Sequence, residues 1–227
     1  MVVLDDIISL FYPRLCAGCN VSLIKGEEFL CLNCIADLPR TNFHLISENP
    51  VSLQFIGRVP LELATSFCRF DKGGRLQRLL HQLKYKGNRE VGHKMGLLFG
   101  YDLIQSTQYC KIDAIMPIPL HPKKEKKRGF NQSTEICKGL SEAMNRPLIT
   151  GNLIRDVHTD SQTRKGRFER WENVSGIFTV KHSVSLEGMH LLLVDDVITT
   201  GATLEAAAMP LLRIPGVRVS IATLACA

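Results

Sequence analysis

Hydrophobic positions in the second half of the chain form unbroken runs that alternate with segments of helical spacing. The runs at residues 112–120, 189–194 and 217–224 have the length of buried strands, and apolar residues repeat at helical intervals within 130–144 and 203–212. Apolar strands that alternate with helices indicate a parallel sheet with both faces covered. The expected fold class is therefore α/β.

The region before this sheet predicts one further strand and two helices. Residues 64–70 alternate loosely between apolar and polar positions, as a strand does. Four leucines then recur along one face of a helix: Leu76, Leu79, Leu80 and Leu83. A second helix is expected over about 89–104, and two weaker strands are expected near 148–154 and 176–180.

The N-terminal quarter has no comparable rhythm. A short helix is expected over 4–12, where Pro13 ends it, while residues 40–60 combine prolines with scattered polar residues and predict a connector. We therefore expect two parts. Residues 1–60 hold the helix, a cysteine-rich module and the connector, and 61–227 form the main α/β domain.

Four of the eight cysteines stand in a C-x2-C-x11-C-x2-C pattern: Cys16, Cys19, Cys31 and Cys34. Two tight turns that each carry two thiolates supply the four sulfurs that zinc prefers in a tetrahedral arrangement. A disulfide pair and two reduced motifs without a metal are the alternatives, and a reducing compartment disfavours disulfides. The sequence predicts a structural zinc site, and the other four cysteines are expected to be small core residues.

Composition excludes several classes of protein. The chain has 227 residues, 45% of them hydrophobic, and a mean hydropathy of +0.04, which argues against a disordered chain, a membrane protein and a collagen-like repeat. The N-terminus lacks a basic region, and Asp5 and Asp6 interrupt its apolar run, so neither a secretory signal nor membrane insertion is expected. We expect a cytoplasmic protein.

The net charge of +6 comes from one stretch of the chain. Residues 81–130 hold ten lysines and arginines against four acidic residues, whereas the rest of the chain is balanced at eighteen each. A basic stretch of this kind binds an anionic ligand, binds nucleic acid, or is a solvated surface loop. Only 7% of the residues are aromatic, which disfavours strong autonomous binding of single-stranded DNA.

The most informative segment is a hydrophobic strand that ends in two carboxylates and a threonine- and glycine-rich turn: Leu191-Leu-Leu-Val-Asp-Asp-Val-Ile-Thr-Thr-Gly-Ala-Thr203. Ligands of open α/β sheets bind beyond the carboxyl ends of the strands, and a helix that starts there offers free N–H groups to a phosphate. Gly201 allows close approach of the backbone to the anion. Asp195 and Asp196 are suited to accept hydrogen bonds from vicinal sugar hydroxyls. A sugar 5-phosphate would fit both the anion-binding turn and the two carboxylates. The alternative is a buried strand followed by an acidic turn without a ligand.

Position by position, these thirteen residues resemble the binding signature for phosphoribosyl pyrophosphate (PRPP) of type I phosphoribosyltransferases. The resemblance implies that Asp195 and Asp196 bind the ribose hydroxyls. It also implies a 5-phosphate site made of Thr199, Thr200, Gly201, Ala202 and Thr203. The segment is not a Walker A loop, because the G-x4-G-K-[ST] pattern is absent.

The chain as a whole resembles the ComF family, whose members are bacterial proteins of the competence and DNA-utilisation group. The resemblance rests on the four-cysteine module, the expected 5-phosphate site at residues 199–203 (the phosphate loop) and three further motifs: Leu83-Lys-Tyr-Lys-Gly87, Pro117-Ile-Pro-Leu-His121 and Arg128-Gly-Phe-Asn-Gln132. It implies a type I phosphoribosyltransferase-like parallel sheet flanked by helices, preceded by a small zinc-ribbon-like module.

The family resemblance also implies where the diphosphate of PRPP binds. Type I enzymes bind it on the loop after the first core strand, here about Leu120–Gly129, and close a mobile catalytic loop, here about 155–172, over the substrate. The candidate cations are Lys84, Lys127, Arg128, Arg164 and Lys165. Ordinary exposed loops are the alternative for both segments.

The resemblance implies Mg²⁺-dependent transfer of phosphoribosyl from PRPP to an acceptor that the sequence does not identify. Displacement of pyrophosphate at the anomeric carbon passes through an oxocarbenium-like state, which the protein promotes by positioning and charge neutralisation. Two alternatives remain. One is a non-catalytic competence protein that handles single-stranded DNA or a helicase partner, and the other is a PRPP-sensing regulator.

Overall fold

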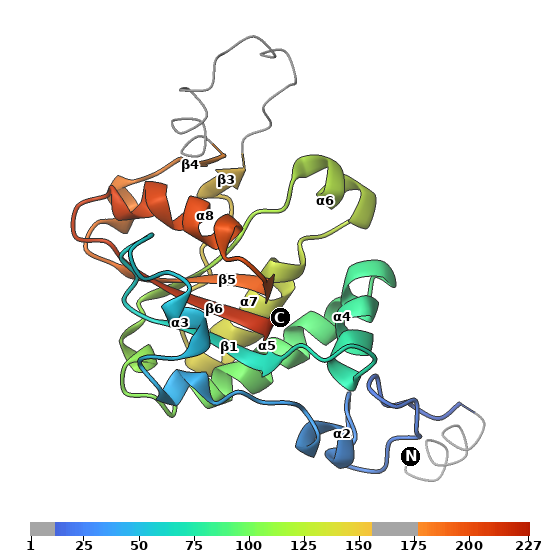
Figure 1. Cartoon of the computed structure of the whole chain (residues 1–227). Helices are drawn as coiled ribbons and strands as arrows, with labels where there is room; N and C mark the ends of the chain where they lie inside the picture. Colours follow the sequence, from blue (N-terminus) through green and yellow to red (C-terminus); the bar gives the residue numbers. More distant parts are fainter. Residues whose placement is uncertain (1–11, 156–176) are drawn as a thin grey trace.

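The computed structural model describes residues 12–155 and 177–227 (Figure 1). Its centre is a four-stranded sheet in the order β1–β6–β5–β2, in which every neighbouring pair is parallel. The strands are β1 (Ala64–Arg69), β2 (Ala114–Pro117), β5 (His190–Ile198) and β6 (Arg218–Cys226). The expected parallel α/β sheet is therefore confirmed.

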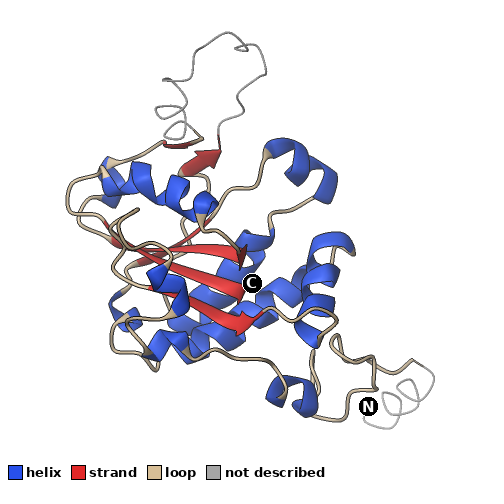
Figure 2. Cartoon of the chain, viewed as in Figure 1, coloured by secondary structure: helices blue, strands red, loops and turns tan. Residues whose placement is uncertain are grey.

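Helices cover both faces of this sheet, as Figure 2 shows. The main helices are α4 (Arg75–Tyr85), α5 (Arg89–Leu103), α7 (Gln132–Met144) and α8 (Ala202–Leu212). The first three pack on one face and α8 packs on the other, so the molecule has two hydrophobic cores. Successive side chains of β5 point to opposite faces, and for this reason Leu192 belongs to the first core and Leu193 to the second.

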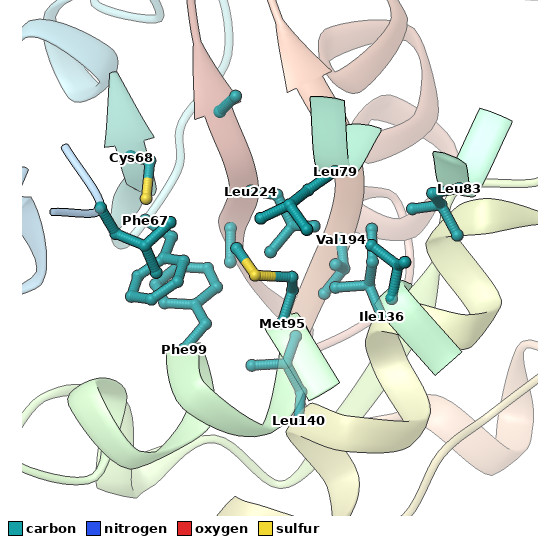
Figure 3. Packing of buried hydrophobic residues seen from close by; sticks show 14 of the residues in the cluster. Phe67, Cys68, Leu79, Leu83, Met95, Phe99, Ile136, Leu140, Val194 and Leu224 are labelled. Atoms are coloured by element: carbon teal, nitrogen blue, oxygen red, sulfur yellow. The ribbon is translucent and has the colours of Figure 1, made fainter. Parts of the chain in front are cut away.

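Figure 3 shows side chains of the first core. Within this core, α5 and α7 are in close contact. Glycines allow this contact. A Cβ atom added at Gly139 would lie 2.0 Å from the carbonyl oxygen of His93, and one at Gly96 would lie 2.1 Å from that of Ile136. The two helices therefore meet backbone against backbone.

The cysteine-rich segment packs onto this first core. Cys16, Cys31 and Cys34 are buried in the same cluster as the leucines of α4, and the segment carries one short helix, α2 (Leu32–Ala36). The side chain of Gln82 on α4 donates a hydrogen bond of 2.6 Å to the carbonyl oxygen of Ala17. The division of the chain at residue 60 stays a prediction, and the residues on its two sides share one core.

Residues 40–60 contain two short helices where the sequence predicts a connector. They are η1 (Phe43–Leu45) and α3 (Pro50–Leu53). Asn49 begins α3 with a capping box, in which its side-chain oxygen accepts from the N–H groups of Val51 and Ser52. The segment also contributes buried side chains to the second core.

Most of residues 120–129 form a helix, and the prediction of a loop there is wrong. The helix α6 (Pro122–Arg128) starts with a proline in its first turn, and the His121 ring accepts from the N–H of Lys123. It ends at Gly129, which has a φ of 82°. A run of lysines is typical of a solvated loop, but the proline before it and the glycine after it are helix boundaries.

Two smaller strands and two 3-10 turns complete the part of the chain that the structure describes. β3 (Leu153–Arg155) and β4 (Phe178–Val180) form an antiparallel pair outside the main sheet, and the turns are η2 (Tyr109–Lys111) and η4 (Val184–Leu186). The helix expected at 4–12 lies almost wholly outside the described residues. Within them, no helix is long and apolar enough to span a bilayer.

Candidate functional site

The loop between β5 and α8 presents the start of a helix to solvent. Gly201 has a φ of 74°, which lets the chain turn from the loop into α8 at Ala202. Thr199, Thr200 and Thr203 are exposed around this turn, as is Ala202. The N–H groups of the first helical turn have no partners within the helix, so the turn can hold an anion.

Asp195 lies close to this loop, inside strand β5. The strand continues to Ile198 because its pairing with β6 extends that far, so the predicted strand end at the two carboxylates is wrong. The Asp195 carboxylate accepts hydrogen bonds from the Ser133 hydroxyl (2.9 Å) and from the N–H of Asp196 (2.8 Å). Burial, and then the charge of Asp196, raises the pKa of Asp195 to about 7 in spite of these donors.

Asp196 forms an ion pair with Lys84 of α4, with 2.9 Å between Oδ2 and Nζ. Both side chains are largely shielded from solvent, at 15% and 25% exposed. The sequence counts Lys84 among the candidate cations for a diphosphate. In the structure this lysine neutralises the second carboxylate of the expected ribose site.

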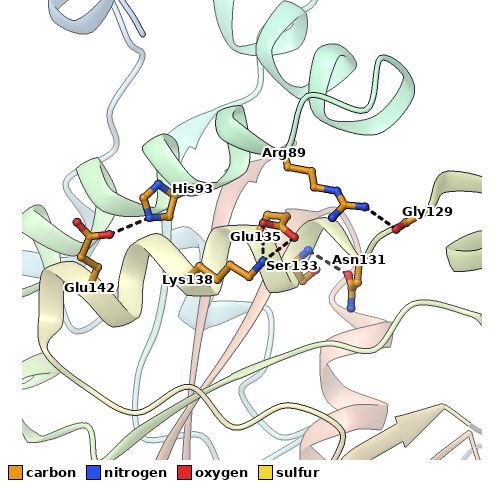
Figure 4. A network of polar contacts seen from close by, with 8 residues as sticks. All are labelled: Arg89, His93, Gly129, Asn131, Ser133, Glu135, Lys138 and Glu142. Atoms are coloured by element: carbon orange, nitrogen blue, oxygen red, sulfur yellow. Dashed lines mark hydrogen bonds and ion pairs between the residues drawn. The ribbon is translucent and has the colours of Figure 1, made fainter. Parts of the chain in front are cut away.

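The motif Arg128-Gly-Phe-Asn-Gln132 connects α6 to the carboxylate pair, and Figure 4 shows part of this network. Asn131 donates to the carbonyl oxygen of Ile118 (2.8 Å), and as the N-cap of α7 it accepts from the N–H of Ser133 (3.0 Å) in the first turn of that helix. The sequence does not predict Ser133 as the partner of Asp195. The available signal was a hydroxyl residue in the first turn of a helix capped by asparagine.

The helix α6 holds two of the candidate diphosphate cations. Lys127 is exposed, and the guanidinium carbon of Arg128 lies 6.0 Å from the centre of the Tyr85 ring at the end of α4. This contact ties the basic end of α6 to the helix that carries the lysine of the ion pair. Arg164, Lys165 and nearly all of the expected catalytic loop lie outside the described residues.

A pocket of about 320 Å³ borders both the ion pair and the phosphate loop. Its walls are mainly apolar and come from α4 and the strand ends: Phe70, Gln77, Leu80, His81, Lys84, Tyr85, Val197, Thr199 and Ala227. The rings of His81 and Tyr85 lie 5.0 Å apart at its edge. Its size and lining suit a small flat molecule.

The four motif cysteines meet in space, as the sequence predicts. Their sulfurs all lie within 4.8 Å of one another, and Sγ of Cys19 is 3.7 Å from Sγ of Cys31. Sulfurs bound to zinc at about 2.3 Å lie about 3.8 Å apart in a tetrahedron, so this cluster could hold a zinc ion. Burial raises the pKa of the Cys16 thiol, but backbone N–H donors, led by that of Cys31, outweigh it and lower the pKa to about 6.

Comparison with known proteins gives one family model and several relatives. A model described as a phosphoribosyl transferase domain matches residues 153–226, from β3 to β6. The chain is similar to the DNA utilization protein YhgH of Escherichia coli (strain K12), with 26% identity over 88% of this chain and 92% of that protein. It is similar to the competence protein ComFC of Bacillus subtilis (strain 168), with 28% identity over 84% of this chain and 81% of that protein.

A partial likeness to a solved structure accompanies these relatives. The structure is that of an allosteric regulatory enzyme of purine biosynthesis, with a TM-score of 0.43 and 18% identity. The overlap covers 62% of this chain and 29% of that chain, so this chain spans less than a third of that enzyme.

Proposed function

This chain belongs to the ComF family, and on that basis we propose that it binds PRPP at the carboxyl end of β5. One observation carries the proposal. Asp195 and Asp196 lie near the carboxyl end of β5, and two residues later the strand gives way to an exposed loop that opens α8 with N–H groups unpaired within the helix. The strand lies inside a parallel sheet, and ligands of such sheets bind at the carboxyl ends of the strands.

The ligand contacts follow from this placement. The 5-phosphate is held by the loop residues and the first turn of α8: Thr199, Thr200, Gly201, Ala202 and Thr203. Asp195 and Asp196 accept hydrogen bonds from the ribose hydroxyls. Hydroxyls that bind Asp196 displace Lys84 from its ion pair, and the freed ammonium group is then available to the diphosphate.

The proposed reaction is transfer of phosphoribosyl to an acceptor. The bond between ribose C1 and the diphosphate breaks, the diphosphate leaves with the bonding electrons, and the acceptor forms a new bond to C1. Mg²⁺ bound with PRPP would neutralise charge on the diphosphate, and the carboxylate oxygens of Asp195 and Asp196 are hard ligands that would suit such an ion. The protein cations proposed for the diphosphate are Lys84, Lys127, Arg128, Arg164 and Lys165.

The pocket between α4 and the strand ends is the proposed position of the acceptor. It shares Lys84 with the carboxylate pair and Thr199 with the phosphate loop, so a molecule inside it lies beside the ribose. The apolar walls favour a flat ring over a charged acceptor.

Titration with PRPP and Mg²⁺ tests the proposal, with and without a panel of nucleobases, while pyrophosphate release is followed. Saturable binding with release that depends on one base supports a transferase. Saturable binding without release under every base supports a PRPP sensor. A protein that does not bind PRPP refutes the proposed site.

Single-stranded DNA, alone or with a helicase, is the second candidate partner. The cations of α6 favour it, because they outnumber what one diphosphate requires: Lys123, Lys124, Lys126, Lys127 and Arg128. The relatives are named for DNA utilization and competence, which agrees with this role. We favour the diphosphate as their ligand because α6 follows β2, the strand that pairs with β5.

A further inference from the structure

The segment after α3 contacts the back of the phosphate loop, far from it in sequence. Nη1 of Arg58 donates to the carbonyl oxygen of Thr200 at 2.9 Å, and Nη2 forms an ion pair with Glu205. The Phe55 ring packs against Gly201, where an added Cβ atom would lie 2.9 Å from two ring carbons. One short segment thus holds the loop, its glycine and the first turn of α8.

The charge of Glu205 gives this arrangement a consequence for anion binding. Glu205 lies in the first turn of α8, the turn that offers its N–H groups to a phosphate. An unpaired carboxylate there repels a dianionic phosphate. Arg58 neutralises the carboxylate, and the pair is partly shielded from solvent, with side chains 37% and 28% exposed.

The bond to Thr200 acts on the backbone of the same loop. A carbonyl oxygen that turns toward a bound anion repels it, whereas N–H groups attract it. Because the guanidinium holds the Thr200 carbonyl, that oxygen is kept from turning toward the anion. The Phe55 ring limits movement of Gly201 from the other side.

We propose that Arg58 is a positioning residue for the phosphate loop: it neutralises Glu205 and fixes the Thr200 carbonyl, so that the first turn of α8 accepts a dianionic phosphate. This role of Arg58 rests on the proposed function in one respect, namely that the ligand of the loop is a sugar phosphate. The proposal assigns a role to residues 40–60, which the sequence predicts to be a connector.

Calorimetric binding of ribose 5-phosphate to four variants tests this role. Arg58→Gln is expected to weaken affinity by roughly tenfold, because it leaves a unit charge near the phosphate. Glu205→Gln is expected to leave affinity the same or tighter. The double variant is expected to recover most of the loss. Arg69→Gln is the matched control, since Arg69 also stacks on a phenylalanine of this region, Phe43, and is expected to change nothing.

Two results overturn the proposal: unchanged affinity in Arg58→Gln, or a double variant as weak as Arg58→Gln alone. A purely structural role of Arg58 gives the second result, because removal of Glu205 does not restore a lost support. If the wild-type protein binds neither ribose 5-phosphate nor PRPP, the proposed function fails separately. Amide hydrogen exchange of residues 199–203 then decides: faster exchange in Arg58→Gln supports the positioning of the loop, and unchanged exchange refutes it.

Discussion

At the scale of single residues, we expect the carboxylate of Asp195 to control how the proposed PRPP site responds to pH. Burial and the charge of Asp196 raise its pKa to about 7, while the Ser133 hydroxyl stabilises the charged form in part. Near neutral pH the side chain is divided between its protonated and charged forms. A protonated carboxyl is a weaker acceptor for a ribose hydroxyl than a carboxylate is.

We therefore expect PRPP affinity to rise between pH 6 and pH 8, with release of a proton on binding near pH 7. Calorimetry in buffers of different ionisation enthalpy measures both quantities. Ser133→Ala is the control, because loss of this donor raises the pKa of Asp195 further and moves the rise to higher pH. If PRPP affinity rises over the same pH range in Ser133→Ala, the rise is caused by ionisation of the phosphate, whose second pKa is about 6. Equal affinity at pH 6 and pH 8 contradicts the assignment.

Asp195→Asn combined with Asp196→Asn is expected to abolish PRPP binding in a protein that still folds. The pKa of Asp195 is about 7 in the folded state against 3.8 for the free side chain, so the folded protein binds more protons between these values. The free energy of unfolding therefore falls as the pH rises from about 4 to about 7. Above this range the ionised carboxylates of Asp195 and Asp196 destabilise the folded state. The double variant, which lacks both charges, is therefore expected to have an unfolding midpoint at pH 8 at least as high as that of the wild-type protein. Unchanged PRPP affinity would refute the ribose site, and Asp71→Asn, an exposed carboxylate elsewhere, is the control.

At the scale of elements, we predict that the cysteine cluster stabilises its segment by binding a zinc ion. The purified protein is expected to contain about one zinc per chain, because the sulfur spacing fits four zinc–thiolate bonds. Cys31→Ser is expected to release the zinc and to increase hydrogen exchange in the segment that packs on α4. Cys110→Ser is the control, because Cys110 lies outside the cluster and is exposed, so the prediction that it is a core residue is wrong. Elemental analysis without zinc in protein kept reduced contradicts this prediction.

The contact between α5 and α7 makes Gly139→Ala a strongly destabilising change. The new Cβ atom meets backbone of α5 at 2.0 Å, so the helices must separate. Overpacking of this kind costs about 1–3 kcal/mol of unfolding free energy, and backbone contacts place this site at the upper end. Denaturant unfolding measures the loss. Glu90→Ala on the exposed surface of α5 is the control, and a similar small effect of both changes argues against close helix contact.

At the scale of the whole molecule, positive charge is concentrated in one region. Replacement of the five α6 cations (residues 123, 124 and 126–128) by glutamine is expected to weaken PRPP binding and to spare ribose 5-phosphate, which lacks the diphosphate. If the cations bind DNA instead, the slope of log affinity for single-stranded DNA against log salt concentration becomes shallower by about 0.7 for each lost phosphate contact. Lost DNA affinity with intact PRPP affinity refutes our preference. Lys181→Gln, an exposed lysine on another part of the chain, is the control.

The elements of the fold could be predicted because their signals are local. The leucines of α4 recur at helical spacing, and β5 begins with an unbroken apolar run at residues 191–194. The same holds for the paired cysteines, whose spacing in the chain matches the ligand geometry of zinc. The sequence does not predict helix α6, because its residues are good helix formers but none after Pro122 is apolar, so the segment has no hydrophobic periodicity.

The sequence by itself determined the α/β pattern, the phosphate loop and the four-cysteine motif, because each is encoded by neighbours within about twenty residues. The tertiary structure alone decided which distant side chains meet. Lys84 reaches Asp196, and Arg58 reaches Glu205 across 147 positions. Neither contact has a local pattern, because it depends on the strand order and on which helix covers each end of the sheet. Burial raised the pKa of Asp195 in the same way, since the depth of a side chain is set by the packing of α7 on β5 and not by its neighbours in sequence.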